Sequence, residues 1–380
     1  MGLRIAVLSR NFACTGGGAE RYSIAVVEQL ASRHEVHVFA QNIEHDFPGV
    51  SYHRVAMPLR RPRWINQLYF AAATWWATRK GFDIVHSHEN TWHGNVQTVH
   101  VLPIKHTLFT GKLGLGLGLR WLKVITSPRL LAYLWLESSR YRPQSGRQVV
   151  VTSEPLRETM ISAYPNAEPM LSVITPGVQS VEGRISVAQR LGARERLQLP
   201  PDVPMLLLVG NDMRKKGLPT LLGVLQQLPD LHLTVVGHGD HTGAMRDAAR
   251  TLAGRVHFLG AMSEVADAYR AADILVHPTL EDTYAMVVLE AMSHGLPVVV
   301  SGPKFCGISA DLQNGVNAIL VADPRDIGAF ATAIEKLRAN AEFAAGLVAH
   351  GLDYALAHTW DATGREYERL MIQSTRAPHG

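Results

Sequence analysis

The feature that most constrains this chain is a repeated alternation of short β-branched runs with longer helical patterns, which continues from one end to the other. Such alternation is typical of parallel sheets, because two parallel strands need a long crossover and a helix supplies it. The predicted strands span 3–9, 35–40, 83–87, 148–152 and 171–174 in the first half, and 205–209, 232–236, 255–258, 273–276 and 297–300 in the second. The sequence therefore predicts an α/β protein with two Rossmann-like units.

The length of 380 residues also predicts two domains, since about 150 residues fill one hydrophobic core. The turn Thr175-Pro176-Gly177 ends the first unit, and a polar connector at about 179–186 leads into the second. We expect an N-terminal domain at 1–178, a C-terminal domain at 179–360 and a final helix at 361–380 that returns to the first domain. The two units are expected to face each other across a cleft, with ligands beyond the carboxyl ends of the strands.

Composition excludes several classes of protein. Hydrophobic residues make up 47% of the chain and charged residues 18%, which is typical of a globular enzyme. Cys14 and Cys306 lie far apart and form neither a disulfide framework nor a metal cluster, which fits a reducing cytoplasm. The run 3–9 lacks the features of a signal peptide, and no segment reaches the about 18 apolar residues of a spanning helix. We expect a cytoplasmic protein whose membrane contacts are peripheral.

Positive charge is concentrated in one segment. Residues 101–150 contain eight Lys or Arg and the single acid Glu137, although the whole chain carries a net charge of only +4. The cations are Lys105, Lys112, Arg120, Lys123, Arg129, Arg140, Arg142 and Arg147. Leucines and aromatic residues lie between them, a composition that suits an anionic membrane surface better than nucleic acid. A solvated helical face is the competing interpretation, and the alternating glycines at 114–118 weaken the prediction of a regular helix there.

Two loops after predicted strands of the first half carry candidate residues. Gly16, Gly17 and Gly18 precede a helix at about 19–32, where backbone N–H groups can close on an anion, although a tight turn explains them equally well. His86 and His88 lie at the carboxyl end of the third strand, on the same side but at different depths. A metal pair is one interpretation. We favour His88 as a residue that hydrogen-bonds a sugar hydroxyl.

The loop after the strand 205–209 is strongly basic. Arg214, Lys215 and Lys216 follow one another just before a predicted helix. Three adjacent cations repel one another unless an anion lies among them, and a diphosphate supplies that charge. A cation at this place also stabilises a phosphate group as it departs. A solvated basic turn is the competing interpretation.

The segment 277–299 carries the most specific pattern, which is strand, acidic loop, helix, glycine and strand. Asp282 and Glu290 are separated by about two helical turns and can share one edge of the helix. Carboxylates there accept hydrogen bonds from sugar and ribose hydroxyls, while the N–H groups of the helix start face a phosphate. An acidic turn that only caps a core helix is the competing interpretation.

Taken together, these loops make the chain resemble the retaining glycosyltransferases of family 4, which have the GT-B fold. The resemblance covers nearly the whole chain, is strongest in the second half, and is greatest to the α-glucosyltransferases of the lipopolysaccharide core, through 211–217, 256–260 and Cys306-Gly307. It implies transfer of a hexose from a nucleotide diphosphate sugar, UDP-linked, to a cell-envelope glycan or glycolipid such as lipopolysaccharide core. It also implies retention of configuration, with no metal or other cofactor.

The resemblance assigns roles to individual residues. It implies that Lys216 binds the donor diphosphate with Arg214, and that Glu290 holds the ribose hydroxyls. It places Asp282 at the first carboxylate of the family's E-x7-E pattern, against the transferred sugar, and His88 beside the reacting centre. The expected catalytic residues are therefore His88, Asp282 and Lys216. The expected donor-binding residues are Gly17, Gly18, Arg214, Lys216, Glu281, Asp282, Thr283, Tyr284, Ala285 and Glu290.

The chain departs from the family pattern at two places. Asp282 stands where the family has Glu, and Glu281 precedes it, so either carboxylate can be the one that reaches the sugar. Ala285 replaces the usual glycine and Tyr284 the usual Phe, which narrows the room beside the phosphate. Neither change removes a required functional group.

The mechanism implied by the resemblance is a front-face substitution in which the departing diphosphate takes the acceptor's proton. The chain accordingly lacks the flanking carboxylates of a glycosidase and an Asp-x-Asp sequence for a metal. The expected partners are a nucleotide sugar, a lipid-linked or glycan acceptor and the anionic inner face of a membrane, with no nucleic acid.

Other functions remain as alternatives. A nonhydrolysing sugar-nucleotide epimerase shares the architecture but not the Asp282–Glu290 pattern, and an exopolysaccharide mannosyltransferase would use GDP-mannose instead. An NAD-dependent oxidoreductase needs the GxGxxG fingerprint, which residues 237–239 do not complete. A noncatalytic membrane-associated binding partner is disfavoured by the presence of Lys216, Glu290 and His88.

Overall fold

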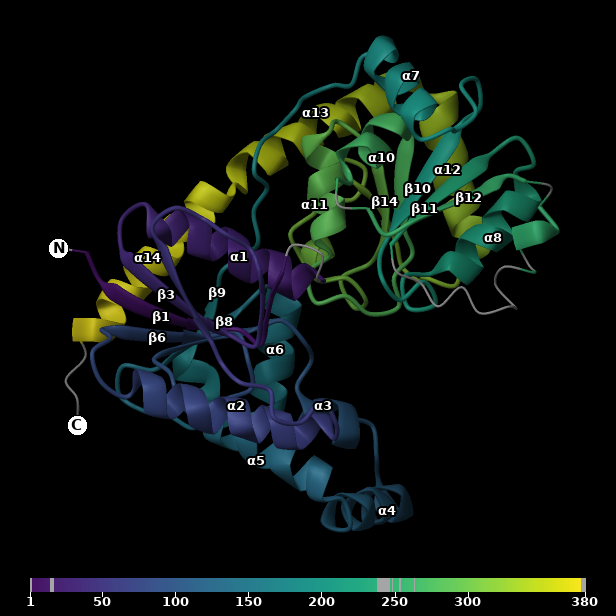
Figure 1. Cartoon of the computed structure of the whole chain (residues 1–380). Helices are drawn as coiled ribbons and strands as arrows, with labels where there is room; N and C mark the ends of the chain where they lie inside the picture. The colour runs from purple at the N-terminus through teal and green to yellow at the C-terminus, as the bar shows by residue number, and fades with distance from the viewer. Residues whose placement is uncertain are drawn as a thin grey trace. The chain divides into compact units, whose positions relative to one another are not determined.

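The computed structural model describes residues 2–13, 17–237, 247, 249–252, 254–262 and 264–376. The chain forms two compact units, of which the first contains Met1–Thr175 and Trp360–Gly380 and the second contains Pro176–Thr359. Each unit is built around a parallel sheet (Figure 1). Cys14, Gly16 and the residues 238–239 considered above lie outside the described residues.

The first unit contains a seven-stranded sheet in the order β5-β3-β1-β6-β7-β8-β9, and β2 pairs separately with β4. Its strands are β1 (Arg4–Leu8), β2 (Asn11–Ala13), β3 (Glu35–Ala40), β4 (Asn42–Glu44), β5 (Val50–Arg54), β6 (Ile84–Ser87), β7 (Val96–Val99), β8 (Gln148–Val151) and β9 (Leu171–Val173). Its helices are α1 (Gly18–Ala31), α2 (Arg63–Thr78), α3 (Ile104–Phe109), α4 (Gly114–Ile125), α5 (Pro128–Arg140), α6 (Glu154–Ala163), η1 (Pro165–Met170) and α14 (Trp360–Arg376).

Both faces of the first sheet are covered. Helices α1 and α14 lie on one face, and α2 and α5 lie on the other (Figure 1). Ala6 and Leu8 of β1 pack with Phe70 of α2, and every residue from Ile5 to Leu8 is buried. Burial on two faces explains why the strand is a continuous apolar run rather than an alternating one.

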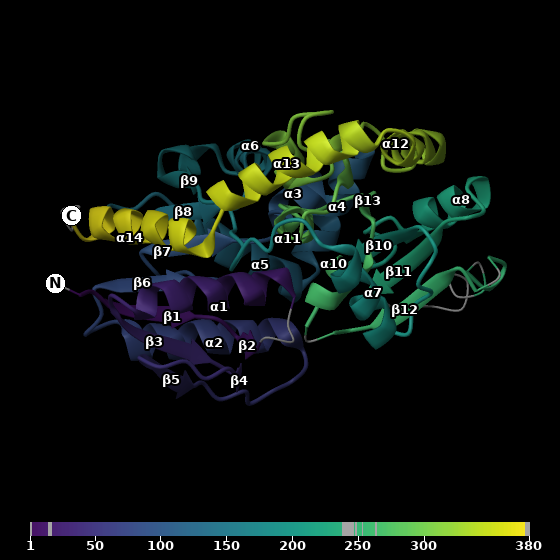
Figure 2. The same ribbon diagram turned by 90° about the horizontal axis from the view of Figure 1, so that it is seen from above.

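The final helix α14 is part of the first unit and lies beside α1 (Figure 2). The buried hydroxyl of Tyr367 on α14 lies 2.9 Å from that of Tyr22 on α1 and 2.8 Å from Thr98 Oγ1 on β7. The ring of Trp360 meets Tyr22 edge-on, with 5.3 Å between ring centroids. These contacts attach the C-terminal helix to the sheet through buried, mutually hydrogen-bonded side chains.

The second unit contains a six-stranded sheet in the order β12-β11-β10-β13-β14-β15. Its strands are β10 (Met205–Val209), β11 (His232–Val236), β12 (Val256–Gly260), β13 (Ile274–His277), β14 (Val298–Ser301) and β15 (Ile319–Val321). Its helices are α7 (Val187–Arg196), α8 (Leu218–Gln227), α10 (Ala266–Ala271), α11 (Met286–Ser293), η2 (Gly307–Ala310), α12 (Ile327–Ala339) and α13 (Ala341–Ala357).

The central strand β10 contributes side chains to two hydrophobic cores. Leu206 and Leu208 pack in the core that contains α8 and α12, whereas Leu207 and Val209 pack in the core that contains α10 and α11. Successive side chains of a strand point to opposite faces, so one short apolar run supplies both layers. The carboxyl end of this strand is thereby held rigidly where the basic loop begins.

The predicted architecture of two Rossmann-like halves is confirmed. Strands β2, β4, β5, β7 and β15 were not predicted. β2, β4 and β15 have only three residues each, β5 is a partly exposed edge strand, and β7 contains the polar residues Gln97 and Thr98. The two units meet in the chain at Thr175, slightly before the expected position 178. Among the described residues no helix has both the length and the apolar composition needed to cross a membrane.

Candidate active site

The loops after β10 and β13 lie together because these strands are neighbours in the second sheet. The backbone N–H of Leu280 donates to the carbonyl of Lys215 at 2.7 Å, which joins the two loops directly. Gly217, with φ +86°, precedes α8, and a Cβ at that position would lie 2.1 Å from the carbonyl oxygen of Pro278. Only glycine permits this close approach.

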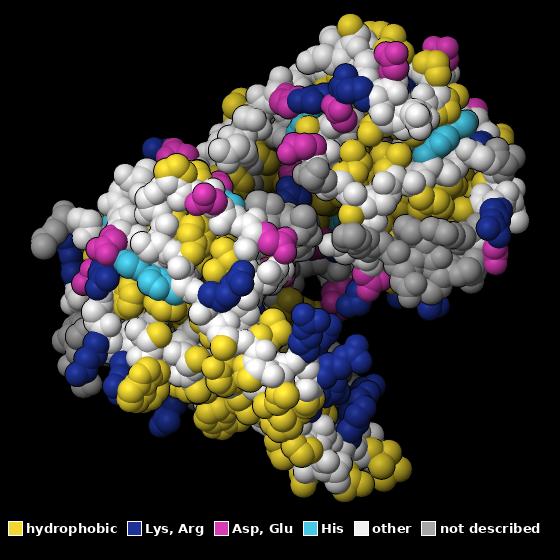
Figure 3. Space-filling view, in the orientation of Figure 1, with side chains coloured by type: hydrophobic (Ala, Val, Ile, Leu, Met, Phe, Trp, Pro, Cys, Tyr) yellow, Lys and Arg dark blue, Asp and Glu magenta, His cyan; other side chains and the backbone are white. Residues whose placement is uncertain are grey.

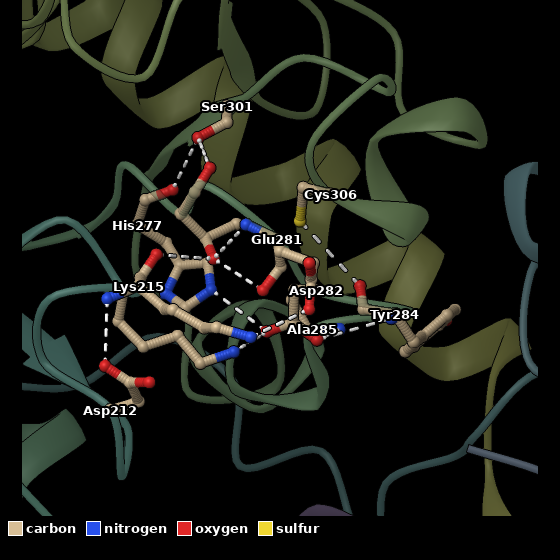
Figure 4. A network of polar contacts seen from close by, with 11 residues as sticks. Asp212, Lys215, His277, Glu281, Asp282, Tyr284, Ala285, Ser301 and Cys306 are labelled. Carbon is tan, nitrogen blue, oxygen red and sulfur yellow. Dashed lines mark hydrogen bonds and ion pairs between the residues drawn. The ribbon is translucent and has the colours of Figure 1, made fainter. Parts of the chain in front are cut away.

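Lys216 and Asp282 form an ion pair at the junction of these loops. Lys216 Nζ lies 2.5 Å from Asp282 Oδ2, and the two side chains are 20% and 17% exposed. His277, buried at the end of β13, donates from Nε2 to the same oxygen at 3.3 Å. The other oxygen, Oδ1, accepts from the backbone N–H of Ala285 at 2.9 Å. Asp282 is therefore the centre of a network that joins both loops to the start of α11 (Figure 4).

The charges in this network follow from burial and contact. Burial by itself raises the pKa of Asp282, but the hydrogen bond from His277 and the positive charge of Lys216 outweigh it, so this pKa lies well below its usual range. Burial lowers the pKa of His277, and the hydrogen bond to Asp282 only partly offsets that effect. At neutral pH the site therefore holds an ionised carboxylate and a neutral imidazole.

The three cations of the basic loop have different surroundings. Lys215 Nζ lies 3.0 Å from Glu281 Oε1, and both side chains are about half exposed. Lys216 is paired with Asp282, whereas Arg214 is exposed and has no ion-pair partner among the described residues. The neighbouring loop supplies two carboxylates to the basic loop, so the repulsion between Lys215 and Lys216 is offset within the protein itself.

Glu290 lies on α11 and is 9% exposed. The hydroxyl of Tyr269, on α10, donates to Glu290 Oε2 at 2.6 Å. The phenol ring stacks on His294, with 5.0 Å between ring centroids. Sequence reasoning missed Tyr269, because a single aromatic residue in a short helix is most often core. The signal that identifies it is structural, namely a buried hydroxyl that needs a partner.

Tyr284 and Ala285 contact the network through their backbone N–H groups, which donate to Asp282 Oδ1. The side chain of Tyr284 is buried in the second unit's core, and its carbonyl accepts from the N–H of Ile308 at 2.8 Å. Ala285 is also buried, and Thr283 is half-buried. The backbone of Asp282 pairs with the segment around Cys306, which anchors the acidic loop. The side chains of Tyr284 and Ala285 thus pack inward, and only their backbone borders the network.

His88 belongs to the first unit, directly after β6. Its Nδ1 lies 2.9 Å from Nε2 of His100, and the two rings are stacked. The ring of His86, fully buried and bonded to Thr98 Oγ1 at 2.7 Å, lies 4.2 Å from that of His88. Burial, followed by the influence of His86, His100 and Arg140, holds the pKa of His88 well below its usual value. His88 is therefore a neutral imidazole at physiological pH.

Gly17 and Gly18 form the start of α1, in the same unit as His88. Gly17 precedes the helix with extended backbone and Gly18 is its first residue, and no side chain caps this helix end. The predicted site residues are thus divided, with Gly17, Gly18 and His88 in the first unit and the others in the second.

Ala285 offers a test of local backbone strain. It adopts φ +74° and ψ +67° directly before α11, a left-handed conformation that costs a residue with a side chain about 1–2 kcal/mol. We expect Ala285→Gly to raise the free energy of unfolding by about 0.5–1 kcal/mol, after the entropic cost of glycine is subtracted. Denaturant unfolding measures the change. Gly217→Ala is the control with the opposite sign, and a less stable Ala285→Gly variant would show that Ala285 is not strained.

Comparison with known proteins adds family information to this geometry. Residues 16–181 match the family model described as Glycosyltransferase Family 4, and residues 203–340 match the model described as Glycosyl transferases group 1. An uncharacterised glycosyltransferase of Methanocaldococcus jannaschii is 25% identical over 376 residues, which cover 92% of this chain and 93% of that protein. The D-inositol 3-phosphate glycosyltransferase of Mycolicibacterium smegmatis is 28% identical over 243 residues, which cover 61% of this chain and 55% of that relative. The matched region thus spans little more than half of the latter protein.

Solved structures support the same fold over nearly the full length. WaaG, described as a glycosyltransferase involved in lipopolysaccharide biosynthesis, matches with a TM-score of 0.81 at 18% identity, over 97% of this chain and 99% of that one. HepE of Anabaena, solved in complex with UDP-glucose, matches with a TM-score of 0.75 at 17% identity, over 98% and 100% of the two chains.

Proposed function

Because the chain is a glycosyltransferase with the GT-B fold, in which a family 4 domain precedes a group 1 domain, we propose that it transfers a hexose from a UDP-linked donor to a cell-envelope glycan or glycolipid. Lipopolysaccharide core is the proposed acceptor class. The observation that carries the proposal is the Lys216–Asp282 pair, held at the carboxyl ends of two adjacent strands beside the exposed Arg214. The transfer retains configuration and needs no metal.

Lys216 is the proposed stabiliser of the leaving group. An ammonium group has three N–H donors, so one bond to Asp282 leaves donors for a diphosphate. As the bond between the sugar and the phosphate oxygen breaks, negative charge grows on the diphosphate, and a fixed cation there lowers the barrier. The acceptor oxygen forms a new bond to the anomeric carbon on the same face of the sugar, and its proton passes to the departing diphosphate oxygen. Arg214 adds a second cation that no carboxylate of the described residues neutralises.

Between the two adjacent carboxylates, Glu281 is the proposed partner of the sugar hydroxyls. A carboxylate has about four lone-pair sites. The four donors that surround Asp282 are Lys216 Nζ, His277 Nε2 and the backbone N–H groups of Tyr284 and Ala285. Asp282 is thereby saturated within the protein, which suits it to orient Lys216, whereas Glu281 is half exposed. The sugar-binding role that the resemblance gave to Asp282 passes to its neighbour in this proposal.

A panel of nucleotide sugars tests the proposed function. Purified protein is incubated with UDP-, GDP- and ADP-linked hexoses, with and without EDTA, and nucleotide release is measured together with the sugar product by NMR. We expect one UDP-linked hexose to be hydrolysed slowly, with the anomeric configuration retained and no effect of EDTA. Preference for GDP-mannose would favour the mannosyltransferase, and a changed configuration at C2 of an unreleased sugar would identify an epimerase.

The proposed membrane partner rests on the first unit's exposed helix α4. This helix is regular despite its three glycines, and Val124 is its only buried residue. Lys112, Arg120 and Lys123 lie together around Gly116. The exposed apolar side chains of α4 are Leu115, Leu119, Trp121, Leu122 and Ile125. A helix with cations beside exposed leucines and tryptophan binds the interface of an anionic bilayer.

Neighbouring helices extend this surface. Helix α5 packs beside both α2 and α4, and Figure 3 shows hydrophobic side chains gathered over these helices. Trp75 and Trp76 of α2 and Trp135 of α5 are 42%, 64% and 53% exposed. The guanidinium of Arg79 lies 3.6 Å from the ring centroid of Trp76. Residues 47–82 contain no Asp or Glu, so the aromatic surface lies in a segment free of acids.

Two cations of the segment 101–150 are buried and therefore cannot contribute to membrane binding. Arg140 and Arg147 are each 5% exposed. Arg140 donates to the carbonyl of Thr98 at 2.5 Å, and Arg147 donates to that of Trp92 at 3.1 Å. Their guanidinium groups instead hydrogen-bond to backbone carbonyls inside the first unit.

Cosedimentation with vesicles tests the membrane proposal. We expect binding to vesicles that contain anionic phospholipid, weakened by salt, and weakened at least about tenfold in the triple variant Lys112→Gln, Arg120→Gln and Lys123→Gln, because each cation contributes up to about 1 kcal/mol at an anionic surface. The matched control replaces three exposed cations of the second unit, Arg250, Lys304 and Arg325, with Gln. Equal binding to neutral and anionic vesicles, or equal losses in the two triple variants, would contradict a specific role for α4.

A further inference from the structure

Glu290 has a protein donor whose position is fixed independently of any ligand. Tyr269 is 1% exposed, and its hydroxyl donates to Glu290 Oε2 at 2.6 Å. Its ring stacks on His294, whose Nδ1 lies 2.9 Å from the carbonyl oxygen of Glu290. The phenol and the helix turn that carries Glu290 therefore hold each other in place.

The short helix α10 that carries Tyr269 is itself anchored by ion pairs. Arg270 binds Glu182 at 2.5 Å and Asp267 at 3.0 Å, and Asp267 binds Arg196 of α7 at 2.7 Å. The hydrogen bonds from Arg196 and Arg270 outweigh the effect of burial and lower the pKa of Asp267 to about 2. These pairs keep α10 against α7, so the hydroxyl of Tyr269 approaches Glu290 from a rigid support.

A fixed support of this kind lowers the entropic cost of binding when a glutamate side chain accepts hydrogen bonds from a diol. An unrestrained Glu loses up to about 2 kcal/mol of rotamer entropy when it is fixed, and that cost falls on ligand binding if the ligand does the fixing. A carboxylate has about four lone-pair sites, so it can accept from a phenol and from the vicinal hydroxyls of a ribose at the same time. A buried phenol that only needed a partner would be satisfied by any carbonyl, but here it is directed to the side chain of a proposed ligand-binding acid.

We propose that Tyr269 is a positioning residue for nucleotide recognition: its hydroxyl orients the Glu290 carboxylate so that this carboxylate accepts hydrogen bonds from the ribose hydroxyls of the donor. The inference rests on the proposed function, since it takes Glu290 as the ribose-binding acid. It identifies α10, outside the motifs of the sequence, as a determinant of selectivity for ribonucleotides.

The test compares ligands that differ only in the ribose hydroxyls. Calorimetry measures the Kd of UDP and of 2′,3′-dideoxy-UDP, and of the corresponding guanine nucleotides, for the wild type and for Tyr269→Phe, which keeps the ring stacked on His294. We expect Tyr269→Phe to weaken UDP binding about tenfold, as the loss of a hydrogen bond to a charged group does, and to change the dideoxy nucleotide less than about twofold. The preference for ribose thus falls by about the same tenfold factor.

Glu290→Ala supplies the matched background. In Glu290→Ala the further change Tyr269→Phe should leave the Kd of UDP unchanged, because the phenol then has no carboxylate to orient. Two results would overturn the positioning role and leave Tyr269 a structural residue. In the first, the losses of UDP affinity caused by Glu290→Ala and Tyr269→Phe add in the double variant. In the second, Tyr269→Phe lowers the affinity for UDP and for its dideoxy form by the same factor. A wild type that binds neither uridine nor guanosine diphosphate would overturn the proposed function itself.

Discussion

Lys216→Ala is expected to lower kcat for transfer by at least about a hundredfold while the protein stays folded, because removal of one fixed group that stabilises transition-state charge costs a factor of about 10²–10³. Lys216 Nζ is held by Asp282 at 2.5 Å, so its position is set before the donor binds. Steady-state kinetics with the donor identified by the panel measure the effect.

Lys215→Ala is the matched control for this prediction. Lys215 is the adjacent residue, carries the same charge and pairs with Glu281, but its side chain is 53% exposed. Exposed ion pairs contribute about 0–1 kcal/mol, so we expect less than about a fivefold change in kcat from this loss of charge. Equal effects of the two substitutions would mean that the loop acts by its net charge alone and that the Lys216–Asp282 geometry is irrelevant to turnover.

Lys216→Ala also has an effect on stability that depends on pH. Asp282 has a pKa well below its usual range in the folded protein. Its ionised form therefore stabilises the fold fully above the unfolded pKa of about 4. This stabilisation is lost as the pH falls through the pKa of the folded protein. Lys216→Ala removes one cause of the lowered pKa. The difference in unfolding free energy between wild type and variant should therefore be largest near neutral pH and shrink as the pH falls below about 4.

His88→Ala is expected to abolish most sugar transfer, by about a hundredfold or more, while nucleotide diphosphate binding changes less than about twofold. The reason is that His88 belongs to the first unit, whereas Lys216 and Glu290, the proposed donor-binding residues, belong to the second. Kinetics give the first quantity and calorimetry with UDP gives the second. An equal loss of nucleotide affinity and turnover would show that His88 supports the donor site as a whole.

The protonation state of His88 adds an expected pH dependence to this prediction. Its pKa is held well below the ordinary value of 6.5, chiefly by burial, so the ring is neutral throughout the physiological range. The pH profile of transfer by the wild type should therefore contain no inflection near pH 6.5 that is caused by His88. The profiles of the wild type and of His88→Ala should have the same shape in this range. His350→Ala, at an exposed position on α13, is the control for loss of a histidine and should leave both kinetics and binding unchanged.

Much of the fold follows from local patterns in the sequence. The run Met205–Val209 predicts a strand, and the structure has that strand with its side chains divided between two cores. The segment 277–299 likewise predicts strand, loop, helix and strand, which the structure contains as β13, α11 and β14. Both predictions succeed because the signal, an apolar run ended by glycine or polar residues, lies within the element itself. Strand β5 was missed because at a sheet edge its side chains remain partly exposed.

The sequence by itself determined the two-unit α/β plan, the family resemblance and the loops in which charged residues gather. Only the tertiary structure decided how those residues share their interactions. It saturates Asp282 with four donors and leaves Glu281 exposed, it buries Arg140 and Arg147 among carbonyls, and it brings the Tyr269 hydroxyl to Glu290. Each of these outcomes depends on contacts between segments far apart in the chain, and the free energy of a buried polar group is set by such partners rather than by its neighbours in sequence.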